Sequence, residues 1–181
     1  MMGKRYLFVF CFYLASFFSV CYAGDIALMD VFNTDDWSCK KAIVSYDDIT
    51  QGLKIRKSGF TPNWGSAKLE LGKINVSDPE ENNLRFEVGD LNGKYAINIH
   101  YGGKDLYDSQ YIELQDSTNM AGEQKYNISE TLRSAGLSDL QEIQLEIKVI
   151  DDDDQPGNAM VLFENLTFGY DDNFAVIPSR K

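Results

Sequence analysis

The sequence has few residues that could carry redox, metal or nucleophilic chemistry. Three of its 181 residues are cysteine and one is histidine. Cys11 and Cys21 lie in an apolar N-terminal segment, so the rest of the chain holds only Cys39 and cannot form an intrachain disulfide. The fold must therefore depend on an apolar core. A multi-histidine zinc site or a serine triad would need partners that this composition does not supply.

Both of these scarce residues lie in stretches of alternating polar and apolar residues. Cys39 falls within a predicted strand, where we expect a buried and inert thiol. His100 lies on the polar side of another predicted strand, and a structural histidine is the default for such a position. A contact with a ligand is the alternative for His100. We predict no catalytic residue and expect no enzymatic activity.

Long apolar runs are also scarce, and the one present is at the N-terminus. Lys4 and Arg5 precede an uncharged segment over residues 6–20, and Ala23 follows where a signal peptidase accepts a small residue. This segment is shorter than the roughly 20 residues that span a bilayer. We therefore predict a signal peptide over 1–23 and a secreted or periplasmic protein that does not span the membrane.

An alternative for the N-terminus is a lipoprotein anchored at Cys21. The bulky Val20 before this cysteine disfavours that alternative. The remaining chain has the size of a single domain. We expect a β-sandwich domain over residues 24–170, followed by a polar C-terminal tail over 171–181.

Basic residues are outnumbered by acidic ones. The chain has 17 Lys and Arg against 28 Asp and Glu, a formal charge of −11. Removing Lys4 and Arg5 with the signal peptide leaves 15 − 28 = −13. A nucleic acid or an anionic membrane is therefore not expected as a partner, because both are bound through a basic surface. Neutral ligands and cations remain as possible partners.

Alternation of apolar and polar residues dominates the chain after the signal segment, with little helical periodicity. This pattern predicts an all-β fold, an antiparallel two-sheet β-sandwich with one polar face on each sheet. The clearest strands are expected over 53–57, 67–71, 84–88, 95–101 and 143–149, and less regular ones over 26–32, 37–46, 107–114 and 160–168. The last of these is apolar on both faces, which is typical of a central strand.

One short helix is predicted, from Ser129 or Glu130 to Ala135. Asn127 or Ser129 can cap its start, and Gly136 follows where a helix commonly ends.

Aromatic side chains are the main signal for a ligand. Sugar rings stack on exposed aromatic rings, and the polar tip of Trp or Tyr can bond hydroxyl groups. Trp37 opens a predicted strand and is expected in the core. Trp64 follows Pro62-Asn63 at the edge of a loop, where it is a candidate for the surface.

The most concentrated charge is the run of four aspartates at 151–154. Such a run can gather oxygen ligands for Ca²⁺, but the spacing of an EF-hand loop is absent. A solvated turn that keeps strand edges from pairing is the simpler interpretation.

The order of segments resembles the galactose-binding-domain-like β-sandwich, a jelly roll shared by many carbohydrate-binding modules. The resembling features are Phe32 and Trp37, Gly52-Leu53, Trp64-Gly65, Leu69-Glu-Leu71, Tyr126-Asn-Ile128, the strand over 143–150 and a closing segment over 161–168. They extend over nearly all of the chain after the signal segment.

This resemblance implies several properties of the chain. Family members commonly hold a structural calcium between the first and last strands, which points to Asp30 and Glu164 as metal ligands here. They bind sugar in end loops or on the concave sheet face, which points to Trp64, Tyr101, Tyr107 and His100. Such modules usually adjoin a catalytic domain, and none is evident in this chain.

The expectation that follows is a non-catalytic domain that binds a polysaccharide or other glycan. Two alternatives stay open. One is a structural or protein-interaction sandwich that binds no sugar. The other is a small polysaccharide lyase or hydrolase using tyrosine or carboxylates, which the scarcity of histidine disfavours.

Overall fold

The structure is a computed structural model that describes residues 33–77, 82–102, 110–152 and 156–170. The predicted signal peptide and C-terminal tail lie outside these residues. The elements are η1 Thr34–Asp36, β1 Trp37–Lys40, β2 Ala42–Asp47, β3 Gly52–Lys57, β4 Trp64–Asn75, β5 Asn82–Asn92, β6 Lys94–Tyr101, β7 Gln110–Thr118, β8 Gly122–Asn127, α1 Ile128–Ser134, β9 Leu140–Ile150 and β10 Met160–Tyr170. None of the helices in the described ranges has the length and apolar character needed to cross a bilayer.

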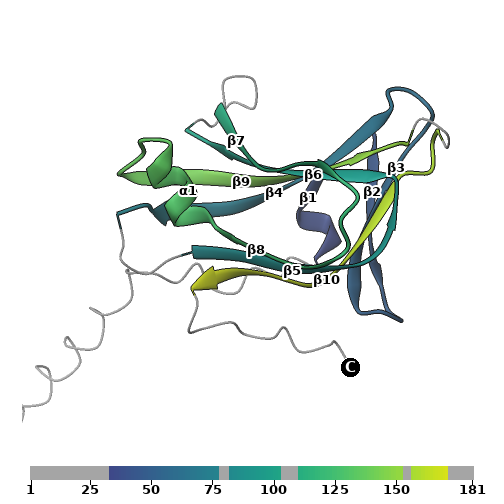
Figure 1. Cartoon of the computed structure of the whole chain (residues 1–181), viewed down its shortest axis with the longest axis horizontal. Helices are drawn as coiled ribbons and strands as arrows, with labels where there is room; N and C mark the ends of the chain where they lie inside the picture. The colour runs from purple at the N-terminus through teal and green to yellow at the C-terminus, as the bar shows by residue number, and fades with distance from the viewer. Residues whose placement is uncertain (1–32, 78–81, 103–109, 153–155, 171–181) are drawn as a thin grey trace, which may run out of the picture.

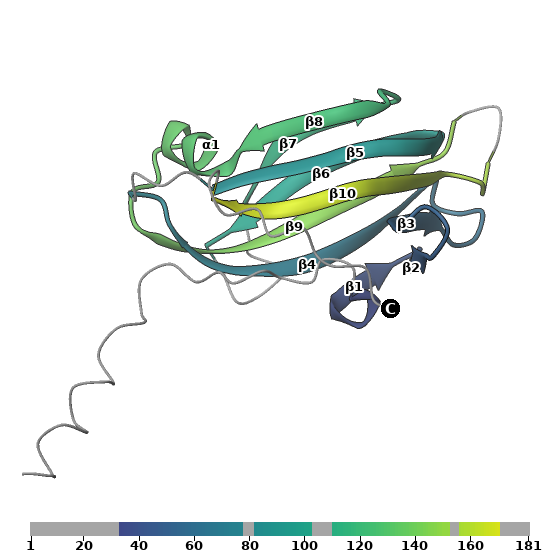
Figure 2. The same cartoon turned by 90° about the horizontal axis from the view of Figure 1, so that it is seen from below.

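The strands form two antiparallel five-stranded sheets. Sheet A has the order β1-β4-β9-β6-β7, and sheet B has the order β2-β3-β10-β5-β8. Figure 1 shows the two layers, with α1 between them at one end, and Figure 2 shows the same arrangement turned by 90°. The prediction of an antiparallel two-sheet sandwich with one short helix is confirmed. Strand β10 is central in sheet B, as its apolar sequence indicated.

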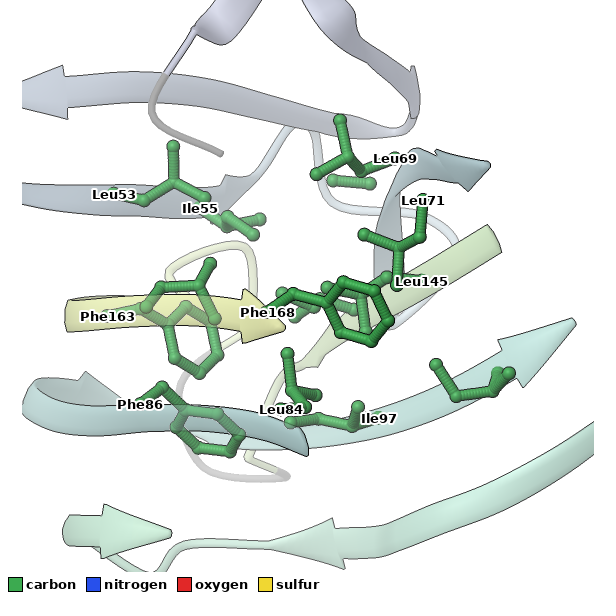
Figure 3. Packing of buried hydrophobic residues seen from close by; sticks show 14 of the residues in the cluster. Leu53, Ile55, Leu69, Leu71, Leu84, Phe86, Ile97, Leu145, Phe163 and Phe168 are labelled. Atoms are coloured by element: carbon green, nitrogen blue, oxygen red, sulfur yellow. The ribbon is translucent and has the colours of Figure 1, made fainter. Parts of the chain in front are cut away.

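The core lies between the two sheets and is built from the inward residues of each alternating strand. On β4, Leu69 and Leu71 are buried while the intervening Glu70 is exposed, as the period of two requires. The rings of Phe86, Tyr95 and Phe163 meet edge to face, with centroids 5.1 to 6.4 Å apart. Figure 3 shows Phe86 and Phe163 among the aliphatic side chains of both sheets. Such ring pairs add about 0.5–1.5 kcal/mol each beyond burial.

The stretch predicted as one strand over 37–46 is two strands in different sheets. Lys41 has a φ of 55° and turns the chain, so β1 pairs with β4 in sheet A while β2 pairs with β3 in sheet B. The corner packs against Gly65, where a Cβ would overlap the carbonyl oxygen of Lys41. Trp37 is buried as predicted.

The prediction of a buried thiol at Cys39 is wrong. Cys39 is exposed, because β1 is the edge strand of sheet A and only its first residue, Trp37, is buried.

The helix is confirmed, with a start one residue earlier than expected. The Asn127 side chain accepts a hydrogen bond from the backbone N–H of Glu130 at 2.9 Å, which caps the first turn. Gly136 follows with a φ of 84°, a conformation that favours glycine. Strand β8 was not predicted, because polar and charged residues occupy most of its positions.

The loops at the end of the sandwich opposite α1 meet around a buried ion pair. Lys57 Nζ lies 2.7 Å from Asp151 Oδ2, and both side chains are almost fully buried. Asp151 also accepts hydrogen bonds from the backbone N–H groups of Gly157 and Ala159. The first aspartate of the run is thus a buried structural group rather than part of a solvated turn. Asp153 and Asp154 lie outside the described residues.

Candidate functional site

A groove of about 810 Å³ lies on the outer face of sheet A, away from the core. It is lined by Ser38 and Lys40 from β1, Trp64, Ser66 and Lys68 from β4, His100 from β6, Glu146, Lys148 and Ile150 from β9, and Asn63 from the loop before β4. The lining residues of each strand are two positions apart, because alternate side chains of a strand point to the same face.

The floor of the groove is a hydrogen-bonded polar cluster centred on Glu146. Its Oε2 lies 2.9 Å from Nε2 of His100 and accepts a hydrogen bond from the side-chain amide of Asn98 at 3.2 Å. The ammonium groups of Lys68 and Lys148 lie 3.7 and 3.6 Å from its carboxylate oxygens. Glu146, Asn98 and His100 are all buried. The strand register explains the cluster, because Lys68 and Asn98 are the cross-strand neighbours of Glu146.

These partners keep Glu146 ionised. Burial of the carboxylate alone would raise its pKa. The hydrogen bonds from His100 and Asn98, with the charges of Lys148 and Lys68, outweigh burial and lower the pKa of Glu146 to about 2. The carboxylate therefore holds the floor in place and is not available as a proton donor near neutral pH.

One aromatic ring, Trp64, lines the groove, and a second, Tyr111, lies beside two lining residues, His100 and Lys148; each ring has a lysine ammonium over it. Trp64 is half-buried, and Lys40 Nζ lies 5.5 Å from its ring centroid. Tyr111 on β7 is 58% exposed, and Lys148 Nζ lies 5.7 Å from its ring centroid. The Tyr111 ring also lies against that of His100, with centroids 5.6 Å apart. Both distances to lysine are within the range of cation–π interactions.

The structure brings together two of the four residues predicted to bind a ligand. Trp64 and His100 both line the groove. Tyr101 lies on the other side of β6, packs against the core, and donates a hydrogen bond from its hydroxyl to Gln110 at 3.0 Å. Tyr107 lies outside the described residues.

Several residues of this face were not predicted as site residues, namely Lys40, Lys68, Tyr111, Glu146 and Lys148. The alternation in the sequence indicated part of this face. The predicted strands over 67–71, 95–101 and 143–149 already placed Lys68, His100 and Glu146 on polar faces. What the sequence did not contain was the strand order that puts β4, β9 and β6 side by side.

The calcium hypothesis concerns Asp30 and Glu164, and Asp30 lies outside the described residues. Glu164 on β10 is half-buried, faces Glu87 across the strand pair, and extends over Gly89. Within the described ranges, no group of three or more His, Cys, Asp or Glu side chains could hold a metal ion. The calcium hypothesis therefore stays a prediction.

Comparisons with known proteins give similar solved structures at low identity. No protein-family model matches the chain, and no curated protein matches it. The chain is similar to TmCBM61 in complex with beta-1,4-galactotriose (5% identity, covering 77% of this chain and 91% of that chain, TM-score 0.42). It is also similar to a structure described as CBM4 (10% identity, 75% and 95%, TM-score 0.45) and to the CBM22-1 xylan-binding domain from Paenibacillus barcinonensis Xyn10C (15% identity, 76% and 86%, TM-score 0.41).

Proposed function

We propose that this domain binds a carbohydrate chain in the groove on the outer face of sheet A and performs no chemistry on it. The observation that carries the proposal is the combination of an open groove lined by Trp64, a polar floor, and a second exposed ring, Tyr111, next to the lining residues His100 and Lys148. Aromatic faces take the C–H faces of sugar rings, and fixed polar groups bond their hydroxyls.

The spacing of the two rings suits an oligosaccharide better than a single sugar. Trp64 and Tyr111 lie on strands three positions apart in sheet A, and their register partners on β9, Ile150 and Gln144, are six residues apart. With about 4.8 Å between strands and about 3.4 Å per residue, the backbone positions of Trp64 and Tyr111 are roughly 25 Å apart along the diagonal of the sheet. A ligand that contacts both rings must be several sugar units long.

All the groove residues except Asn63 lie on paired strands, which hold their backbone in place. Glu146 and His100 are held at 2.9 Å, and both are buried on the central strands of sheet A. Groups fixed in this way lose little conformational entropy when a ligand binds. The site is thus suited to selective binding of an extended ligand.

The chemistry of the groove supports binding without hydrolysis. A glycosidase normally uses two carboxyl groups, one of which donates a proton. Among the described residues that line the groove, Glu146 is the single carboxylate, and its pKa of about 2 keeps it ionised.

The proposal includes the setting of the domain. A signal peptide over 1–23 would deliver it to the periplasm or the medium, where polysaccharides are accessible. A calcium ion bound by Glu164 and Asp30 would be structural rather than part of the groove, since β10 belongs to sheet B.

A glycan array probed with the secreted domain tests the proposal. We expect binding of oligosaccharides that Trp64→Ala weakens strongly and Phe60→Ala preserves. Phe60 is a matched control, because its ring is 77% exposed and does not line the groove. Absence of binding to any glycan would favour the protein-interaction alternative, and release of reducing ends or unsaturated sugars would favour the enzymatic one.

A further inference from the structure

The groove has the opposite charge from the rest of the chain. Its described lining contains Lys40, Lys68 and Lys148 and one carboxylate, Glu146, which gives 3 − 1 = +2 with histidine neutral. The whole chain has a formal charge of −11. A positive groove on an acidic protein focuses the electrostatic potential on one ligand-sized area.

Glu146 does not use up the hydrogen-bonding capacity of the lysines. The ammonium groups of Lys68 and Lys148 lie 3.7 and 3.6 Å from its oxygens, beyond ordinary hydrogen-bond distance. Each ammonium has three donors, and the side chains of Lys68 and Lys148 are 22% and 34% exposed. Both can therefore donate to a ligand while remaining near Glu146.

The two outer lysines are paired with the two aromatic rings. Lys40 lies over Trp64 and Lys148 lies over Tyr111. Each pair presents an aromatic ring for a sugar face next to a cation for an acidic group. A neutral sugar would use only the ring and the neutral hydrogen-bonding groups, whereas an acidic sugar would use both members of the pair.

We propose that the groove selects acidic polysaccharides, whose sugar units carry a carboxylate or a sulfate, and that Lys40, Lys68 and Lys148 bind these anionic groups. This inference rests on the proposed function and names its ligand class. Glu70 and Glu113 are exposed on the same face, in positions beside Gln144 and Asn98. The anionic groups are therefore bound at the three lysines rather than beside Glu70 or Glu113.

The experiment compares matched acidic and neutral ligands with the secreted domain. The probes are oligomers of galacturonate, mannuronate, guluronate and sulfated galactose, with methyl-esterified oligogalacturonate and galactan and mannan oligomers as neutral counterparts. Affinities are measured from about 0.01 M to about 1 M ionic strength, over which the Debye length falls from about 30 Å to about 3 Å. We expect binding of at least one acidic oligomer, weakened at least tenfold at high salt, and weak or no binding of its neutral counterpart.

Lysine variants link the selectivity to the groove. Lys40→Gln and Lys148→Gln should each weaken binding of the acidic oligomer about fivefold, the effect of one partly exposed ion pair. Lys73→Gln is the matched control, since Lys73 is an exposed lysine of the same sheet that does not line the groove. It should leave the affinity unchanged.

The outcomes separate this inference from the proposed function. Equal, salt-independent binding of neutral and acidic oligomers would overturn the acidic selectivity and leave carbohydrate binding in place. Binding of no glycan would overturn both. Equal losses in Lys40→Gln and Lys73→Gln would assign the selectivity to the general field of the protein and overturn the role of the groove lysines.

Discussion

Two buried carboxylates, Asp151 and Glu146, are each held ionised by the protein, but their surroundings differ. Asp151 is enclosed at the end of the sandwich, where Lys57 lies at 2.7 Å and two backbone N–H groups complete its hydrogen bonds. Lys57 in turn donates to the carbonyl oxygen of Gly59 at 2.6 Å. Glu146 lies in an open groove, with Lys68 and Lys148 at longer distances.

The difference separates a structural ion pair from a binding surface. Around Asp151 each charge has a close partner, so the pair joins the loops after β3 and β9 and has nothing left for a ligand. Around Glu146 the cations outnumber the carboxylate and stay partly exposed. An excess of partly exposed charge, rather than the presence of an ion pair, distinguishes the groove.

The largest expected effect is the loss of stability when the buried Lys57–Asp151 ion pair is broken. Asp151→Ala leaves the Lys57 ammonium buried without its counter-ion and should lower the free energy of unfolding by about 3–5 kcal/mol. Urea denaturation measures this loss. Asp152→Ala is the control, because Asp152 is about half exposed and 3.9 Å from Lys94, and it should cost less than about 1 kcal/mol. Similar losses in the two variants would contradict the structural role of Asp151.

The two tryptophans extend the comparison between enclosed and open positions. Trp37→Ala removes a buried ring from the core and should lower the free energy of unfolding by about 3–5 kcal/mol. Trp64→Ala should change stability much less and weaken glycan binding by about 2 kcal/mol. Thermal melts and titrations of both variants test the contrast. If Trp64→Ala unfolds as Trp37→Ala does, Trp64 is a core residue.

Acid should act on Glu146 in a defined range of pH. Its pKa falls from an ordinary value of 4.5 to about 2 in the folded protein, so its stabilising contribution is complete above pH 4.5. That contribution is lost as the pH falls through about 2, and it amounts to as much as about 3 kcal/mol. Urea denaturation at steps of pH, for the parent and Glu146→Gln, should show a smaller acid-induced loss in the variant. If the free energy of unfolding of the two proteins fell in parallel with pH, Glu146 would not be the group responsible for the acid-induced loss.

Glu146→Gln should also make the groove more positive relative to the rest of the chain. The amide keeps the shape of the side chain and removes the only carboxylate of the described groove lining. Affinity for an acidic oligosaccharide should rise about fivefold, the effect of about 1 kcal/mol, with a steeper dependence on salt. Isothermal titration measures the change. A loss of affinity would show that the carboxylate itself bonds the sugar.

The smallest expected effect concerns calcium. If Glu164 and Asp30 share an ion, millimolar Ca²⁺ should raise the melting temperature by a few degrees through mass action, and a chelator should reverse it. Affinity for glycan should stay unchanged, because Glu164 belongs to sheet B. Identical melting curves with Ca²⁺ and with chelator would contradict a calcium ion bound by Glu164 and Asp30.

The sequence predicted those parts of the fold in which alternation is strong. The strands around Leu69, Ile97 and Leu145 and the helix capped by Asn127 follow from local pattern alone. The corner at Lys41 and the polar strand β8 did not, because the first depends on contact with Gly65 and the second has little apolar periodicity.

The candidate site was harder to predict than the fold. Trp64 and His100 were chosen for their chemistry, and both line the groove. Tyr101 was chosen for the same reason, although alternation along β6 puts it on the opposite side from His100. The lysines could be assigned to the site only from the order of the strands, because that order brings Lys68 and Lys148 close to the same carboxylate.

The exposed Cys39 provides a position for a label next to the groove. It is the only cysteine from residue 24 onward, and its neighbours Ser38 and Lys40 both line the groove. Because Cys39 alternates with these residues, its thiol is on the opposite face of β1, and a fluorophore attached to it would lie at the sheet edge without replacing a lining residue. Partial burial of the sulfur raises the pKa of the Cys39 thiol, so labelling would proceed best in mildly alkaline buffer. One covalent label would then report ligand arrival in real time.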